Sequence, residues 1–218
     1  MSEKCPIIAI DPGNRQSAYC VIDCNTLRPL EFGKVDNEEL RNKLVFANEQ
    51  GWQWAVIEMV ASYGMAVGRE VFDTVLWIGR FYEALSIQMA QKPRLLCRIE
   101  EKRHICHDSR ANDPAIRRAL IDRFATHDLK NGKGTSKNPD FFYGFKADIW
   151  AAYAVGLDEA TGIAVTGGVG TVYGAGTVTV LDNRSAVYGN DDSHFSVSDL
   201  RVFVLSAGDQ FDFTSGTL

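Results

Sequence analysis

Three acidic residues occupy apolar stretches of the sequence, where a carboxylate is unexpected. Asp11 ends the apolar run 7–10, Glu58 lies in the apolar run 52–60, and Asp148 is surrounded by alanine, isoleucine and tryptophan. A charged side chain is costly to bury unless it is paired or binds a metal ion. We therefore treat these three carboxylates as candidate metal ligands or catalytic groups.

Oxygen-only ligands suit Mg²⁺, or Mn²⁺ in its place. Clustered carboxylates repel one another and raise one another's pKa unless a cation neutralises them. Two such ions held together stabilise both the attacking and the leaving oxygen in phosphodiester cleavage. Taken singly, each residue is weak evidence, and Asp11, which precedes Pro12-Gly13, could simply form a turn. The three together favour metal-dependent hydrolysis.

The surrounding elements have an α/β order. We expect strands over 6–11, 17–23, 29–35, 52–60 and 94–100, and helices over 37–50, 68–90, 111–125 and 144–160. The first three strands form a meander, and the later alternation of strand and helix is typical of an α/β sheet. If the first and fourth strands are neighbours, Asp11 and Glu58 converge, and the final helix can bring Asp148 to the same point.

The composition changes after about residue 160. Short pairs of β-branched or aromatic residues recur there between turn residues, and "TVYG" at 171 returns as "AVYG" at 186. This weak repeat predicts a small β-solenoid or a tight meander. We expect an α/β domain over 1–160 and an all-β C-terminal extension over 161–218.

Basic residues are concentrated in one part of an acidic chain. The net charge is −5, but residues 92–137 contain twelve Lys or Arg and six Asp or Glu. Such a segment predicts a local surface for a polyanion. Its alternative is a solvated charged helix face.

The expected location is the cytoplasm, with no membrane association. The first residues have no signal-peptide pattern, and no apolar run reaches the ~20 residues of a membrane span.

Four segments in order resemble the RuvC-type Holliday junction resolvases of the RNase H-like nuclease superfamily, with wording closest to the phage-borne branch. The segments read "IIAIDPGNRQSAYCVID", "WAVIEMVASYGMAVGREVFDTVLWIGRF", "RIEEKRHICHDSRANDPAIRRALIDRF" and "YGFKADIWAAYAVGL". The resemblance spans residues 6–160. It implies an RNase H-like mixed sheet with flanking helices, and a homodimer that cleaves branched DNA such as a four-way junction.

The resemblance also implies roles for individual residues. Asp11, Glu58 and Asp148 would hold Mg²⁺, with Mn²⁺ as a substitute and no small-molecule cofactor, and Lys102 would lie near the scissile or the adjacent phosphate. Basic side chains of the 92–137 segment would bind phosphates without reading sequence: Arg94, Arg98, Lys102, Arg103, Arg110, Arg117 and Arg118. Tyr63 could stack on an unpaired base near a branch point or simply cover the core.

One departure and three alternatives stay open. Many resolvases have a second metal-binding residue three positions from the last aspartate, but here those positions are Phe145 and Ala151, so Asp140 is a possible stand-in. An actin- or sugar-kinase-like ATPase would need a second half for which the chain has no room. A related nuclease could instead act on forks, flaps or RNA–DNA hybrids, and a binding or assembly protein could retain a vestigial site.

Overall fold

A computed structural model describes residues 6–47, 49–61, 68–159, 162–173, 177–191, 194–206 and 208–218. The chain divides into two compact units, Met1–Glu159 and Ala160–Leu218, and each is described by itself. Tyr63 lies outside the described residues.

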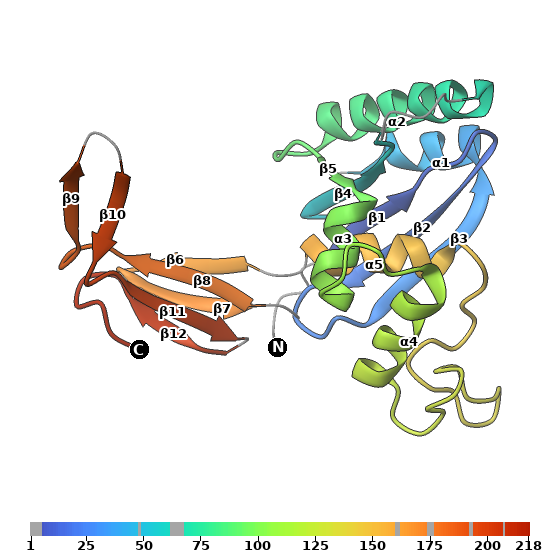
Figure 1. The fold of residues 1–218 in the computed structure, drawn as a ribbon. Helices are drawn as coiled ribbons and strands as arrows, with labels where there is room; N and C mark the ends of the chain where they lie inside the picture. Colours follow the sequence, from blue (N-terminus) through green and yellow to red (C-terminus); the bar gives the residue numbers. More distant parts are fainter. Residues whose placement is uncertain are drawn as a thin grey trace. The chain divides into compact units, whose positions relative to one another are not determined.

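The first unit is built on a five-stranded mixed sheet with the order β3-β2-β1-β4-β5 (Figure 1). Its strands are β1 (Pro6–Asp11), β2 (Gln16–Asp23), β3 (Pro29–Asp36), β4 (Trp54–Met59) and β5 (Arg94–Cys97). The first three pair antiparallel, whereas β1 pairs parallel with β4 and β4 parallel with β5. The predicted α/β sheet with a meander on one side is confirmed.

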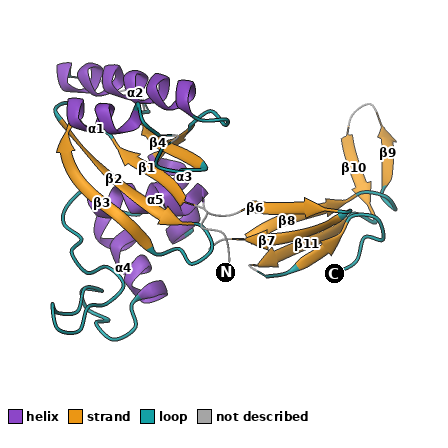
Figure 2. Ribbon diagram, turned by 180° about the vertical axis from the view of Figure 1, so that it is seen from behind, coloured by secondary structure: helices purple, strands orange, loops and turns teal. Residues whose placement is uncertain are grey.

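Helices cover both faces of this sheet (Figure 2). The helices α1 (Asn37–Leu44) and α2 (Arg69–Gln88) lie on one face, where Leu40 and Phe81 join the core cluster with Ile8 and Ile10. The other face carries α5 (Ile149–Glu159), against which α3 (Arg98–Cys106) and α4 (Asp113–Phe124) pack. Among the described helices, none is long and apolar enough to cross a membrane.

A glycine lets α5 lie directly on the sheet. A Cβ atom at Gly156 would come within 2.6 Å of the Ala9 Cβ and of the Ile22 Cδ1. Real Cβ atoms do not approach so closely, so any larger residue would force α5 away from β1 and β2. The position of α5 matters because Asp148 immediately precedes it.

Two boundaries differ from the sequence prediction. The strand expected over 94–100 ends at Cys97, and α3 follows without a connecting loop. The Cys97 backbone N–H donates to the Glu100 carboxylate (2.9 Å), which satisfies one of the donors that a helix start leaves free. Asp148 was expected inside the last helix but comes just before its first residue, Ile149.

The second unit is all-β, but within its described residues there is no solenoid. Its strands are β6 (Gly162–Thr166), β7 (Val169–Tyr173), β8 (Thr177–Asp182), β9 (Val187–Asp191), β10 (His194–Ser198), β11 (Arg201–Ser206) and β12 (Gln210–Asp212). They form three separate antiparallel sheets, β12-β7-β6, β11-β8 and β10-β9. In the described part of the repeat, Val172-Tyr173 and Val187-Tyr188 lie in different sheets, at β7 and β9, so they do not pair as successive strands.

A buried aspartate organises the long connection between α4 and α5. The Asp140 carboxylate is fully buried and accepts hydrogen bonds from the backbone N–H groups of Thr126, His127, Asp128 and Phe141 at 2.6–2.9 Å. The Thr126 hydroxyl donates a further bond of 2.8 Å. Asp140 is thus committed to the connection and does not line the carboxylate cleft, which rules it out as the stand-in metal ligand.

We predict that Asp140→Asn destabilises the protein at neutral pH. The backbone donors hold the pKa of the Asp140 carboxyl well below its usual range. A depressed pKa gives stability that is complete above the unfolded-state pKa of about 3.9 and is lost as the pH falls below it. At pH 5 the free energy of unfolding, measured by urea titration, should therefore be lower for the variant than for wild type. The difference between the two should be smaller at pH 3.

Asp73→Asn, at a half-exposed position of α2, is the matched control and should change little at either pH. Equal stability of Asp140→Asn and wild type at pH 5 would contradict this account of the connection.

Candidate active site

The pairing of β1 with β4 brings two of the predicted carboxylates together. The strands run parallel with Ile10 opposite Ile57, so the next residues, Asp11 and Glu58, lie side by side at the carboxyl end of the sheet. Ligands of open α/β sheets bind at this end of the strands. The condition that the sequence prediction set for their convergence is therefore met.

A hydrogen-bond network fixes the turn that follows Asp11. The buried hydroxyl of Ser17 accepts from the Gly13 backbone N–H (3.1 Å) and donates to the Asn37 side-chain oxygen (2.7 Å). The Asn37 amide in turn donates to the Gly13 carbonyl (2.8 Å). A Cβ at Gly13 would come within 2.3 Å of the Gln16 carbonyl oxygen, so the turn requires glycine. The strand end that carries Asp11 is consequently rigid.

Asp148 reaches the same place from the other side. Its backbone carbonyl accepts the first hydrogen bond of α5, from the Ala152 N–H (3.0 Å), so the residue is fixed at the helix start. Its half-exposed carboxylate forms an ion pair with Lys34 of β3. Sequence reasoning did not identify Lys34.

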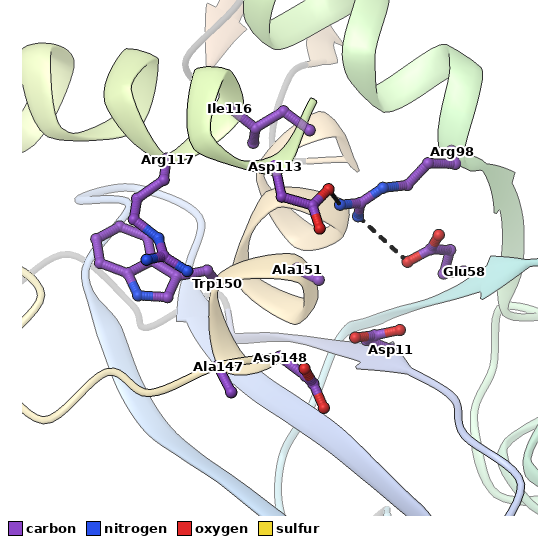
Figure 3. A pocket seen from close by; sticks show the side chains of 10 residues that line it. All are labelled: Asp11, Glu58, Arg98, Asp113, Ile116, Arg117, Ala147, Asp148, Trp150 and Ala151. Atoms are coloured by element: carbon purple, nitrogen blue, oxygen red, sulfur yellow. Dashed lines mark hydrogen bonds and ion pairs between the residues drawn. The ribbon is translucent and has the colours of Figure 1, made fainter. Parts of the chain in front are cut away.

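The three carboxylates line one cleft of about 360 Å³ (Figure 3). Three further charged side chains line it, Arg98, Asp113 and Arg117. Its apolar lining consists of Ile116, Ala147, Trp150 and Ala151. When all are ionised, four carboxylates face two guanidinium groups. The cleft therefore has an excess of negative charge.

Burial and mutual repulsion perturb the paired carboxylates. Burial raises the pKa of the Asp11 carboxyl to about 8, and the charges of Glu58 and Asp148 and a side-chain hydrogen bond with Glu58 act in the same direction. Burial also raises the pKa of Glu58, against the opposing effect of the Arg98 charge. Two acids that resist ionisation side by side are typical of a site that receives a cation.

Arg98 already supplies part of that positive charge. Its Nη1 lies 2.9 Å from the Glu101 carboxylate and 3.5 Å from that of Glu58, and its Nη2 lies 2.6 Å from Asp113. Burial alone would lower the pKa of the Arg98 guanidinium, but Glu101, Glu58 and Asp113 together raise it above its ordinary value. Arg98 was predicted to bind phosphate and instead lies among carboxylates.

Glu101 completes this arrangement from behind. Its side chain has no solvent exposure, and burial raises the pKa of its carboxyl to about 8, with the Arg98 charge opposing. The pattern "RIEEKRH" contains the signal that sequence reasoning missed, because Arg98 and Glu101 are three residues apart and so adjacent on a helix.

The carboxylates do not form a ready-made metal cage. Within the described parts of the chain, no three His, Cys, Asp or Glu side chains are grouped closely enough to hold an ion. The ion pairs explain this arrangement, since Arg98 holds Glu58 while Lys34 holds Asp148. The donor set of Asp11, Glu58 and Asp148 nevertheless consists only of oxygens, which suits Mg²⁺.

Of Lys102, Arg117 and Arg118, Arg117 lines the cleft and the other two do not. Lys102 of α3 is near enough for its charge to lower the pKa of Glu58. Arg117 lines the cleft, with its guanidinium carbon 5.2 Å from the centre of the Trp150 ring. Arg118 binds Asp122 and the Leu129 carbonyl.

Three predicted phosphate ligands lie farther out. Arg94 is on β5, Arg103 is exposed on α3, and Arg110 is in the connection between α3 and α4, where it faces Asp108 at 3.7 Å. None of the three lines the carboxylate cleft.

Comparison with known proteins finds similarity in the fold. No protein-family model and no curated protein sequence matches this chain. The structure of Thermus thermophilus RuvC is similar with a TM-score of 0.51 and 12% sequence identity, covering 71% of this chain and 93% of that one. T. thermophilus RuvC in complex with a Holliday junction gives 0.53 and 13%, covering 72% and 93%. The first unit therefore has an RNase H-like, RuvC-like fold.

Proposed function

We propose that this protein is a metal-dependent endonuclease that cleaves phosphodiester bonds in branched DNA, with the four-way junction as its substrate. The observation that carries the proposal is the convergence of Asp11, Glu58 and Asp148, from three different elements, in one cleft at the carboxyl end of the sheet. The RuvC-like fold supports the choice of substrate, because one of the similar structures is bound to a Holliday junction.

Asp11, Glu58 and Asp148 would hold Mg²⁺ in this proposal. The bound ion would supply electrostatic stabilisation of the oxygens that gain charge during phosphodiester hydrolysis. The chain's own part is positioning: the strand ends fix Asp11 and Glu58, and the start of α5 fixes Asp148. Lys34 would exchange its ion pair with Asp148 for a position beside the DNA backbone.

Arg98 acts as a positioning residue in this account, and this replaces its predicted phosphate contact. Its fork of donors ties Glu58 to Glu101 and Asp113, so the Glu58 carboxylate is held at a fixed place, and the Arg98 charge opposes the rise of its pKa. The charge of Lys102 acts to lower the pKa of Glu58, and we assign Lys102 as the cation that contacts the reacting phosphate.

Two other functions would use the same fold. A related nuclease specific for forks, flaps or RNA–DNA hybrids would have the same carboxylates, and a non-catalytic DNA-binding protein would have a vestigial site. Side-by-side cleavage assays on four-way junctions, flaps, hybrids and linear duplex distinguish the nucleases from one another. Absence of any cleavage with Mg²⁺ or Mn²⁺ would favour the non-catalytic alternative.

We predict that Asp11→Asn, Glu58→Gln and Asp148→Asn each lower the cleavage rate by at least ~10²-fold, the loss that follows removal of a major electrostatic element. Cleavage of a labelled junction should need Mg²⁺ or Mn²⁺ and stop in EDTA. Junction binding should persist, because most phosphate contacts lie outside the carboxylate cluster. The rate is measured at saturating enzyme to separate it from binding.

Glu38→Gln, an exposed change in the first turn of α1, is the matched control and should cleave normally. Near-normal turnover of Asp148→Asn would rule out the three-carboxylate site.

We further propose that two copies of the chain associate through α2. Phe72, Leu76 and Ile87 of this helix are exposed by 65%, 55% and 72% and lie along one face. Gly79 lies on the same face, with open space around it, which would let a second helix approach. A dimer would supply two active sites for paired cuts in a nearly two-fold symmetric junction.

We predict that Phe72→Asp combined with Leu76→Asp yields a monomer, because charges on this face would have to be buried in the dimer. Light scattering at tens of micromolar protein should give a dimer mass for wild type and for the exposed control Leu30→Asp. A monomeric wild type, or a double variant that keeps the dimer mass, would show that α2 is not the interface.

A further inference from the structure

A second cleft of about 360 Å³ adjoins the carboxylate cleft and has the opposite charge. The two clefts share Arg117 and Trp150 as a common wall. The second cleft is lined by α4 and the connection to α5, and counting the shared Arg117 it has three basic side chains and one acidic one: Arg117, Lys130, Lys133 and Asp128. Anything extended that leaves the carboxylate cleft on this side therefore meets positive charge.

The single carboxylate of the second cleft, Asp128, already accepts hydrogen bonds from the backbone of the same connection. Asp128 accepts hydrogen bonds from the backbone N–H groups of Asn131 (3.0 Å), Lys133 (3.2 Å) and Gly134 (3.0 Å). Across the described residues, no ion pair within 4.0 Å joins Lys130 or Lys133 to an acidic side chain. Their charges are thus available to a ligand.

The backbone that carries these lysines is anchored on both sides. Arg118 of α4 donates from Nη1 to the Leu129 carbonyl (3.0 Å), directly before Lys130. Asp140 gathers the backbone donors of 126–128 and 141, as described above. The Gly132 carbonyl accepts from the Phe142 N–H (2.8 Å), and Phe142 is buried against the Trp150 ring, 4.5 Å between centres. The lysines are therefore presented from a fixed scaffold.

The shared wall holds its cation in a fixed orientation. Trp150 is only 5% exposed, and Arg117 lies over its ring with the guanidinium carbon 5.2 Å from the ring centre (Figure 3). Stacking on an aromatic face leaves the N–H groups at the edge of the guanidinium free to donate, an arrangement suited to phosphate oxygens.

We propose that the second cleft is a phosphate subsite, in which Lys130 and Lys133 bind the backbone of the DNA strand whose neighbouring phosphate lies at the carboxylates. The inference rests on the proposed function and extends it, since neither lysine is among the individual residues expected to bind phosphate. The ligand is the phosphodiester backbone, recognised by charge and without base contacts. Arg117 lines both clefts, so the DNA strand would run past Arg117 as it leaves the acidic cleft and enters the basic one.

The test compares Lys130→Ala/Lys133→Ala with Lys137→Ala in the full-length protein. Lys137 is exposed in the same connection but lines neither cleft, which makes it the matched control. Binding of a labelled four-way junction is measured by fluorescence anisotropy in EDTA at several salt concentrations. Loss of two phosphate contacts should flatten the plot of log affinity against log salt by about 1.8, at about 0.9 per contact, whereas Lys137→Ala should keep the wild-type slope.

A second readout separates this subsite from a structural effect. With Mg²⁺, the loss of cleavage rate in the double variant should be larger below enzyme saturation than at saturating enzyme, because phosphate contacts away from the reacting centre act mainly on binding. A double variant with the wild-type salt slope would overturn the subsite while the proposed nuclease stands. A wild-type protein that does not bind the junction would overturn both.

Discussion

The burial of two like charges at neighbouring strand ends is the constraint on which the active site depends. Parallel pairing of β1 with β4 places Asp11 beside Glu58, and burial raises the pKa of both carboxyls. Such an arrangement is costly unless a cation offsets it. The chain supplies one cation to each side, Arg98 at Glu58 and Lys34 at Asp148. A divalent ion bound by all three carboxylates would offset the same repulsion more directly.

The rest of the first unit holds these charges in place. Gly156 allows α5 to lie on the sheet and so fixes Asp148, and the buried Glu101 fixes Arg98 from behind. The connection between α4 and α5, which Asp140 organises, carries Lys130 and Lys133 on the far side of Arg117 and Trp150. A cleft with an excess of acidic side chains and a cleft with an excess of basic ones thus share one wall, although the whole chain has a net charge of −5.

The sheet and the three carboxylates could be predicted from sequence because they leave local signals. Apolar runs of strand length interrupted by a carboxylate are visible without knowledge of the fold, as at Asp11 and Glu58. The contact of Arg98 with Glu58 was missed because the two residues are 40 positions apart, and a basic segment suggests phosphate binding whichever side chains its charges face. The suggestion that Asp140 is a metal ligand failed for a similar reason. Nothing in the neighbouring sequence shows that its carboxylate accepts hydrogen bonds from backbone N–H groups. The prediction of a solenoid in the second unit was wrong because a short sequence repeat does not determine which strands pair.

Anomalous diffraction from crystals of the wild-type protein soaked in Mn²⁺ tests whether Asp11, Glu58 and Asp148 together bind a divalent cation. If they do, a manganese peak lies within coordination distance of all three carboxylates, and Asp148 is released from Lys34. A structure in which Mn²⁺ binds elsewhere, while Asp148 stays paired with Lys34 at saturating metal, would contradict binding by all three.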